Sequence, residues 1–290
     1  MANMRAIRTR IKSLESTQQM TKSMKMVAAS KLRRTQNLYG TLKPFADTCC
    51  DILTSVMDGA ACDENPFLQV RSERKKVCYV LFVGNRGLCG AYNQSILRYM
   101  TQILQQETRE CCLVVCGRWG KEAILKLGVP VEHWFNELSD TPDADAGREL
   151  SAYLKQLYLS EQVDEVVLVY QEYISALTQT PGQKMLLPAS VSQGDLQRRQ
   201  EYLYEPDKKS VLDQLVELYL DHTVYIAMLE AKTSEHSARM TAMTSASDNA
   251  DELIVELHLE LNHARQAAIT TEIAEISGGA ATLAGSAHES

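Results

Sequence analysis

Glycine and proline are distributed very unevenly along this chain. Neither residue occurs from Met1 to Tyr39, and neither occurs in the 71 residues from Asp207 to Ser277. By contrast, ten of the 14 glycines and five of the seven prolines lie between Gly59 and Gly194. Because these two residues are the strongest helix breakers, the pattern predicts a long helix at each end of the chain, with strands and turns between them.

Both terminal runs carry apolar side chains at helical spacing. Ile7, Ile11 and Leu14 follow one another at intervals of four and three residues in the first run. In the second run an approximate heptad spacing continues from Met228 to Ala268, with charged and small residues at several core positions. At ~1.5 Å per residue the second run would be about 105 Å long. We therefore expect a thin, imperfect coiled coil, whose first helix should kink or locally break at Pro44.

The two runs also carry opposite net charge. Residues 1–39 hold nine Lys or Arg against one acid, Glu15, whereas residues 207–290 hold 14 Asp or Glu against five Lys or Arg. Opposite charge favours pairing of the two helices, and the segment between them allows an antiparallel return. The alternative is two solvated helix faces whose charges are unrelated.

The middle of the chain alternates between strand and helix patterns. Strands are expected at 76–83, 111–116 and 165–172, helices at 94–106, 119–127 and 148–159, and an edge strand at 184–189. The predicted fold class is therefore α/β plus a long antiparallel coiled coil: two terminal helices flank a small, mostly parallel, Rossmann-like domain. The predicted division is a coiled-coil helix at 1–58, a linker at 59–74, the α/β domain at 75–204, and a coiled-coil helix with a short tail at 205–290.

A glycine-rich turn, Gly84–Gly90, follows the first expected strand, where a dinucleotide-binding loop would lie. Its G-x-x-G-x-x-G spacing lacks the close glycine pair that admits a pyrophosphate, and the sequence contains no G-x-x-x-x-G-K-[ST] motif. We therefore expect a structural turn and no cofactor bound by the chain itself. Arg86 and Cys89 would be exposed loop residues, and Cys89 would be the one thiol that reaches solvent.

The remaining reactive side chains do not suggest a catalytic or metal site. All eight Cys lie in the first 116 residues, which favours buried thiols in a reducing compartment over a disulfide framework. The three in Cys111–Cys116 lack a fourth ligand at zinc spacing. His258 and His263 are five residues apart, off the face that a helical metal site requires. We expect these two, like His236, to be solvated or at an interface.

The composition also limits the partners. The basic N-terminal run could contact nucleic acid, but its charges alternate with an apolar stripe and the whole chain has a net charge of −7. The longest strong apolar run, Val77–Val83, is far shorter than the ~20 residues of a membrane span. We expect no nucleic acid, no membrane span and no targeting segment.

Five long stretches resemble the gamma subunit of F-type rotary ATP synthases. They are IRTRIKSLESTQQMTKSMKMVAASKLRR, NRGLCGAYN, EYLYEP, SEHSARMTAMTSASDNADELI and LNHARQAAITTEIAEISGGAA, and the resemblance covers essentially the full length. It implies an axle of two terminal helices inside a ring of three alpha and three beta subunits. The α/β domain would sit at the base, beside the epsilon subunit and the membrane ring of c subunits, in a complex that also contains delta.

The resemblance implies a role as well. The chain would be the central rotor shaft, one copy per complex, with no active site of its own, coupling proton flow through the c ring to ATP synthesis or hydrolysis at the beta subunits. It would work at the cytoplasmic face of a bacterial cell membrane. Two other classes stay open from the residues alone: a nucleotide-binding enzyme built on the α/β domain, and a free-standing coiled-coil scaffold that forms a homodimer.

Functional residues are carried over from the family position by position. Arg265 and Gln266 would hydrogen-bond loops of a beta or alpha subunit, and for each position the alternative is an ordinary helix-surface or loop residue. Contacts with the catalytic ring would fall on Met24, Lys25, Arg239, Arg265, Gln266, Thr270 and Glu275. Contacts of the foot with the c ring would fall on Tyr202, Tyr204 and Glu205.

Overall fold

The computed structural model describes residues 2–56, 65–71, 73–136, 138–189, 205 and 207–286. Among them, no helix is both long enough and apolar enough to cross a membrane. The elements in chain order are α1 (Ala2–Val56), β1 (Lys76–Phe82), α2 (Tyr92–Gln106), β2 (Glu110–Cys116), α3 (Lys121–Leu125), β3 (Val131–Phe135), α4 (Ala144–Leu159), β4 (Glu165–Tyr173), β5 (Gln179–Leu187) and α5 (Lys208–Ser286).

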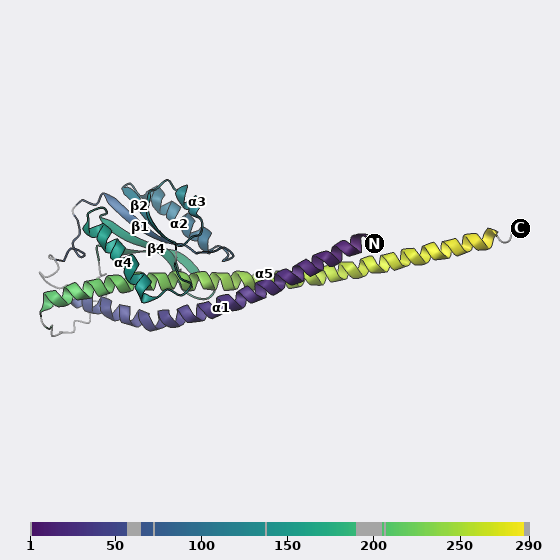
Figure 1. The fold of residues 1–290 in the computed structure, drawn as a ribbon, viewed down its shortest axis with the longest axis horizontal. Coiled ribbons are helices and arrows are strands. Elements are labelled where there is room, and N and C mark those ends of the chain that lie inside the picture. The colour runs from purple at the N-terminus through teal and green to yellow at the C-terminus, as the bar shows by residue number, and fades with distance from the viewer. Residues whose placement is uncertain are drawn as a thin grey trace. The chain divides into compact units, whose positions relative to one another are not determined.

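The chain divides into two compact units, and each is described by itself. Unit 1 consists of Met1–Met26 and Met243–Ser290, and unit 2 of Val27–Ala242. The predicted pair of long terminal helices is confirmed, since α1 has 55 residues and α5 has 79. Each of these two helices contributes to both units (Figure 1).

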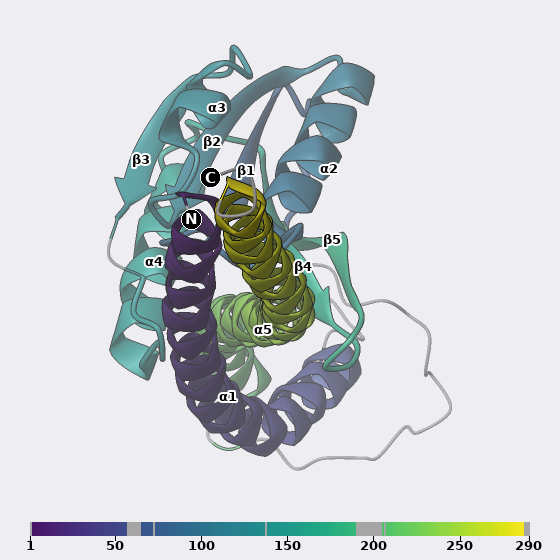
Figure 2. The same ribbon diagram turned by 90° about the vertical axis from the view of Figure 1, so that its right-hand side faces the viewer.

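Unit 2 is built on a five-stranded sheet in the order β3-β2-β1-β4-β5. β1 pairs in parallel with both β2 and β4, β2 pairs in parallel with β3, and β5 pairs antiparallel with β4. Helices α2 and α3 pack on one face of the sheet, and α4 and α5 pack on the other (Figure 2). The predicted fold class, a mostly parallel α/β domain with long terminal helices, is confirmed.

The central strands are buried on both faces, which explains their sequences. In β1 (KVCYVLF) every residue after Lys76 is buried, so the strand is a continuous apolar run without polar alternation. Phe82 packs with Leu154 of α4 and Leu220 of α5 on one face, while Leu81 packs with Met100 of α2 on the other. Burying one such side chain contributes about 1.5–3 kcal/mol relative to exposing it.

In unit 1 the two helices run antiparallel with a narrow seam (Figure 1). Ile7 and Ile11 of α1 are buried, as are Met243 and Ala250 of α5. At the rim, the Asp251 carboxylate pairs with the Lys22 ammonium at 3.6 Å, and both side chains are about half exposed. A few buried side chains and an exposed ion pair make this a thin coiled coil, as the sequence predicts.

Three local expectations differ from the structure. The edge strand β3 is absent from the expected strands, because Val131–Phe135 contains Glu and His in place of an apolar run, and none of its residues is buried. Helix α4 begins at Ala144, four residues before the expected start at 148, and the Asp143 side chain caps it by accepting from Ala146 N at 2.9 Å. Helix α1 also continues through Pro44, so of the expected kink or break the break does not occur.

Candidate functional site

Helix α5 covers the carboxyl ends of the parallel strands. In doubly wound sheets this edge is where ligands bind, at the point where the connections from neighbouring strands diverge to opposite faces. Here α5 lies across it with the segment Ala231–Arg239, which we call the crossing segment. The Tyr92 hydroxyl donates to the Ala231 carbonyl at 3.0 Å, and the Ser234 hydroxyl donates to the Gln171 carbonyl at 3.0 Å. The usual ligand crevice is therefore occupied by the chain's own helix.

The crossing segment contains a buried ion triad, Lys232–Glu235–Arg239. The two Glu235 oxygens accept from Lys232 Nζ at 2.8 Å and from Arg239 Nη2 at 2.6 Å. The side chains of Lys232 and Glu235 are only 1% and 2% exposed, and that of Arg239 is 12% exposed. Burial raises the pKa of Glu235, but the two cations outweigh burial and hold that pKa below its ordinary value. The triad is thus ionised inside the protein, and its two cations neutralise the Glu235 carboxylate.

The loop between β1 and α2 is held against this triad. The Asn93 side chain accepts from Gly84 N at 2.8 Å, and Arg239 Nη2 reaches the carbonyl oxygens of Arg86 and Gly87 at 3.4 and 3.5 Å. A Cβ at Gly84 would lie 3.2 Å from the Glu235 carboxylate. The Gly84 backbone is therefore so close to Glu235 that any larger residue would require the carboxylate to move. The expected structural turn thus serves to seat the loop on α5.

The expectation that Cys89 is exposed is wrong. Its side chain is only 2% exposed, because the thiol turns inward and accepts from Asn93 Nδ2 at 3.2 Å. Leu88 adopts a left-handed conformation (φ 59°) and is 63% exposed instead. Arg86 is exposed, as predicted. A local reversal of the backbone at Leu88 decides which neighbour faces water, and sequence spacing contains no signal for it.

The expectation that His236 is solvated or at an interface is also corrected. Its ring is buried, and Nε2 lies 2.8 Å from the Asp140 carbonyl oxygen. The neighbouring Ser237 hydroxyl donates to the Ala176 carbonyl at 2.7 Å. His258 and His263, farther along α5, are exposed. Small polar side chains of α5 therefore bind the loops that follow β3 and β4, which the sequence analysis did not find.

The residues proposed to contact the catalytic ring have different surroundings. Arg239 lies in the triad, while Met24 and Lys25 are half-buried on α1. The other four are exposed on α5, where the Thr270 hydroxyl donates to the carbonyl oxygen of Gln266 at 2.9 Å. Those four are Arg265, Gln266, Thr270 and Glu275.

The proposed foot contacts fall mostly outside the described residues. Tyr202 and Tyr204 are not among the described residues, and Glu205 is exposed.

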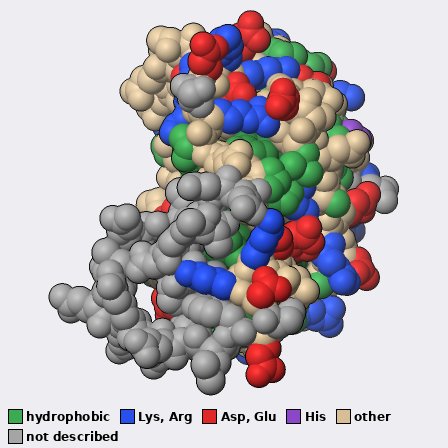
Figure 3. Space-filling model, turned by 90° about the vertical axis from the view of Figure 1, so that its left-hand side faces the viewer, with side chains coloured by type: hydrophobic (Ala, Val, Ile, Leu, Met, Phe, Trp, Pro, Cys, Tyr) green, Lys and Arg blue, Asp and Glu red, His purple; other side chains and the backbone are tan. Residues whose placement is uncertain are grey.

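On the end of the molecule shown in Figure 3, basic and acidic side chains are interspersed. Among the described residues visible on this face, the basic side chains therefore form no broad patch of the kind that nucleic acid binding favours.

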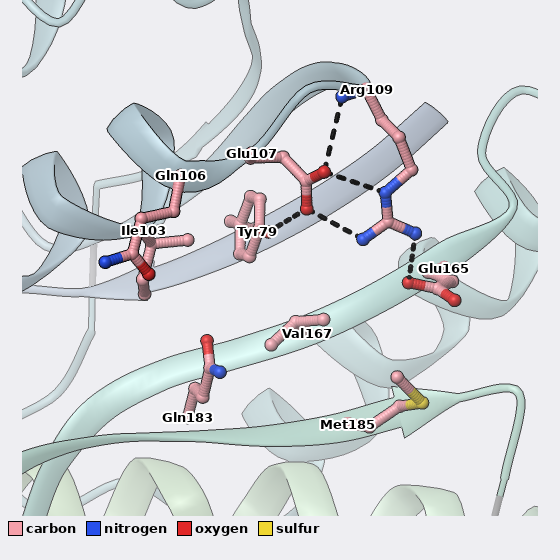
Figure 4. A pocket seen from close by; sticks show the side chains of 9 residues that line it. All are labelled: Tyr79, Ile103, Gln106, Glu107, Arg109, Glu165, Val167, Gln183 and Met185. Carbon is pink, nitrogen blue, oxygen red and sulfur yellow. Dashed lines mark hydrogen bonds and ion pairs between the residues drawn. The ribbon is translucent and has the colours of Figure 1, made fainter. Parts of the chain in front are cut away.

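A second candidate is a cavity of about 340 Å³ between α2 and the β4–β5 edge (Figure 4). Arg109 binds Glu107 at 2.7 Å and Glu165 at 2.8 Å, and the Tyr79 hydroxyl donates to Glu107 at 3.0 Å. Hydrogen bonds from Arg109 lower the pKa of Glu107 to about 2. Arg74 binds the other oxygen of Glu165 at 2.7 Å. Because its charged groups already bind one another, the cavity is less suited to a charged ligand than its composition suggests.

The comparisons with known proteins agree with one another. A family model described as ATP synthase matches residues 3–283. The ATP synthase gamma chain of Symbiobacterium thermophilum is 42% identical over 285 residues, covering 98% of this chain and 99% of that one. The gamma chain of Heliobacterium modesticaldum is 40% identical, covering 98% and 100%.

Solved structures match in fold. A cryo-EM structure of the Euglena gracilis mitochondrial ATP synthase, comprising OSCP, F1 and the c-ring, contains a chain with a TM-score of 0.67 at 20% identity, covering 97% of this chain and 95% of that one. A rotor structure of the same enzyme gives a TM-score of 0.63 at 20% identity, covering 92% and 99%. At this identity the likeness concerns the fold alone.

Proposed function

The chain belongs to the ATP synthase gamma chain family, and we propose that it is the central rotor shaft of an F-type ATP synthase. It couples proton flow through the c ring to ATP synthesis or hydrolysis at the beta-subunit catalytic sites by rotation. The free-standing coiled-coil scaffold is not favoured, because the relatives that match over the full length are gamma chains.

The observation that carries this proposal is the attachment of α5 to the sheet. A shaft must not turn relative to the domain through which it is driven. Turning α5 about its axis would separate the Ser234 and Ser237 hydroxyls from the Gln171 and Ala176 carbonyl oxygens, which belong to the sheet and the loop after it. Leaving a buried polar group without its hydrogen-bond partner costs about 1–3 kcal/mol. The crossing segment therefore resists slippage, and α5 continues without a break from Lys208 to Ser286.

We further propose that the chain has no active site of its own. Support comes from the carboxyl edge of the sheet, where Glu235 and Tyr92 fill the place a nucleotide would need. Nucleotide chemistry then takes place in the beta subunits, and the chain acts through differential contacts at each rotor position.

The partners follow from the same proposal. They are the alpha and beta subunits of the ring, the epsilon and delta subunits, and the c ring, with one copy of this chain per complex. Foot contacts are assigned to Tyr202, Tyr204 and Glu205. Contacts with the catalytic ring are assigned to seven positions: Met24, Lys25, Arg239, Arg265, Gln266, Thr270 and Glu275. The complex lies at the cytoplasmic face of a bacterial membrane, with this chain peripheral.

The four-part division is kept as part of the proposal. Residues 1–58 and 205–290 form the axle, 59–74 the linker and 75–204 the foot. This division is by role along the chain, whereas the two compact units group the residues by packing.

The test is reconstitution with cognate alpha and beta subunits. The Glu122→Cys variant places a label on α3, where Glu122 is exposed in the α/β domain. We expect the complex to hydrolyse ATP and a bead attached at this position to rotate in thirds of a turn. A chain that forms a homodimer and does not enter the ring, or a bead that stays still during hydrolysis, contradicts the proposal.

A further inference from the structure

Two buried cysteines face each other across the centre of the sheet. Cys78 of β1 and Cys112 of β2 are register partners in a parallel pair, so both side chains project from the same face. Neighbouring strands lie about 4.7–4.9 Å apart, and disulfides form between Cα atoms about 4.4–6.8 Å apart. The pair therefore meets the distance requirement for a disulfide, although both cysteines are free.

The surroundings make the two thiols unequal. A hydrogen bond between them, the largest influence on both, lowers the pKa of Cys112 and raises that of Cys78. The Lys76 ammonium also favours the Cys112 thiolate. Because the thiolate is the reactive form, Cys112 is the stronger nucleophile of the two.

Polar side chains near solvent lie close to both thiols. Cys78 and Cys112 are themselves fully buried. The charges of Lys76 and Glu132 act on both thiols, and these two side chains are about one third exposed. A molecule as small as a peroxide needs only a local opening there.

From this geometry we infer that Cys78 and Cys112 form a peroxide-sensitive dithiol, in which Cys112 is oxidised first and Cys78 closes the disulfide. The Cys112 thiolate attacks one peroxide oxygen, the O–O bond breaks, and the departing hydroxide takes up the proton lost by Cys112 to leave as water. Cys78 then attacks the resulting sulfenic sulfur, an S–S bond forms, and the S–O bond breaks. The second hydroxide takes the Cys78 proton, so two thiols and one hydrogen peroxide give one disulfide and two waters.

Three of the other described cysteines, all in the α/β region, lack this arrangement. Cys111 projects from the opposite face of β2, next to its register partner Val77. Cys116 projects from the same face but is paired in register with Phe82, and burial raises its pKa. Cys89 is engaged by Asn93. Cys116 is therefore a matched control: buried, on the same strand and face, without a thiol opposite.

The experiment uses the full chain in its complex with alpha and beta subunits, treated with hydrogen peroxide and then digested without reduction. We expect a linked peptide pair containing Cys78 and Cys112, which is lost on adding dithiothreitol. The Cys116→Ser variant should form the same link. In the Cys78→Ser variant a sulfenic-acid probe should label Cys112, whereas the Cys112→Ser variant should leave Cys78 unlabelled.

The wild-type digest decides the matter even if a variant fails to assemble. Recovery of Cys78 and Cys112 as free thiols, under conditions that oxidise half-buried Cys50 in an intact complex, overturns the inference. A link from Cys112 to any other cysteine, or sulfenic labelling at Cys78 with Cys112 unlabelled, overturns it as well.

Discussion

Helix α5 has two very different surroundings along its length. In unit 2 its crossing segment is buried against the sheet and holds Lys232 and Glu235 at 1% and 2% exposure. In unit 1 the same helix exposes nearly every side chain between residues 259 and 277, including Arg265 and Glu275. Charged residues thus serve as internal anchors in one region and as free surface groups in the other. Whether a charge stabilises this chain depends on its packing and not on its residue type.

The largest expected effect is the loss of the buried anchor. Glu235→Gln leaves Lys232 buried without a counter-charge and should lower the free energy of unfolding of unit 2 by about 3–5 kcal/mol. Urea unfolding of the full chain, followed by the fluorescence of Trp119 and Trp134, measures this change. The control Glu275→Gln, on the exposed part of α5, should stay within about 0.5 kcal/mol of wild type. Equal effects of the two substitutions would show that the burial contrast has no energetic consequence.

The close packing of α5 against α4 gives the next test. A Cβ at Gly147 would lie 2.8 Å from Tyr225 Cβ, so Gly147→Ala should destabilise unit 2 by about 1–3 kcal/mol. Gly40 in α1 has no atom within 4 Å of the corresponding position, and Gly40→Ala should stabilise the helix by about 0.5–1 kcal/mol. Thermal unfolding of both variants should therefore shift in opposite directions.

The exposed part of α5 should respond in the complex and not in the isolated chain. Arg265→Ala should leave the stability of the chain within about 0.5 kcal/mol of wild type. Its affinity for the alpha–beta ring should fall about tenfold or more, because lost charge-assisted contacts cost at least ~1.4 kcal/mol at an interface. Titration of labelled chain into the ring measures this. A variant that binds as tightly as wild type would remove Arg265 from the proposed contacts.

The smallest expected effect concerns acid stability at the half-buried pair of Glu107 and Arg109. The folded-state pKa of Glu107 is about 2, below the ordinary value of 4.5, so its contribution is complete above pH 4.5 and is lost as the pH falls toward 2. Glu107→Gln should flatten the pH dependence of the unfolding midpoint in this window and leave its slope near neutrality unchanged. An unaltered slope between pH 4.5 and 2 would show that the Arg109 bonds do not act in solution.

Much of the architecture is predictable because it depends on short-range patterns. The absence of glycine and proline indicates both long helices, and the apolar runs around Val80, Val114 and Val167 indicate the three central parallel strands. β3 escapes prediction because an exposed edge strand needs no apolar run. Pro44 by itself favours a break that does not occur, since α1 continues through it.

The candidate site was predictable only in part. The stretch containing Ser234–Arg239 stands out through its resemblance to the family, but as helix surface and not as an anchor inside the α/β domain. The burial of His236 and of the Lys232–Glu235 pair requires knowing that the sheet edge covers this turn of α5, although the i,i+3 spacing of the pair is visible in the sequence. Nothing in local spacing indicates that contact, since Gly84 and Glu235 are separated by most of the α/β domain.

By itself, the sequence determined the helix lengths, the strand runs, the charge contrast between the termini and the family, because each of these depends on residue order alone. Tertiary structure decided which charges are anchors and which are free, that Leu88 and not Cys89 faces solvent, and that α5 fills the crevice of its own sheet. The physical reason is that burial and ionic pairing depend on which distant surfaces meet, and those contacts exist only once the chain has folded.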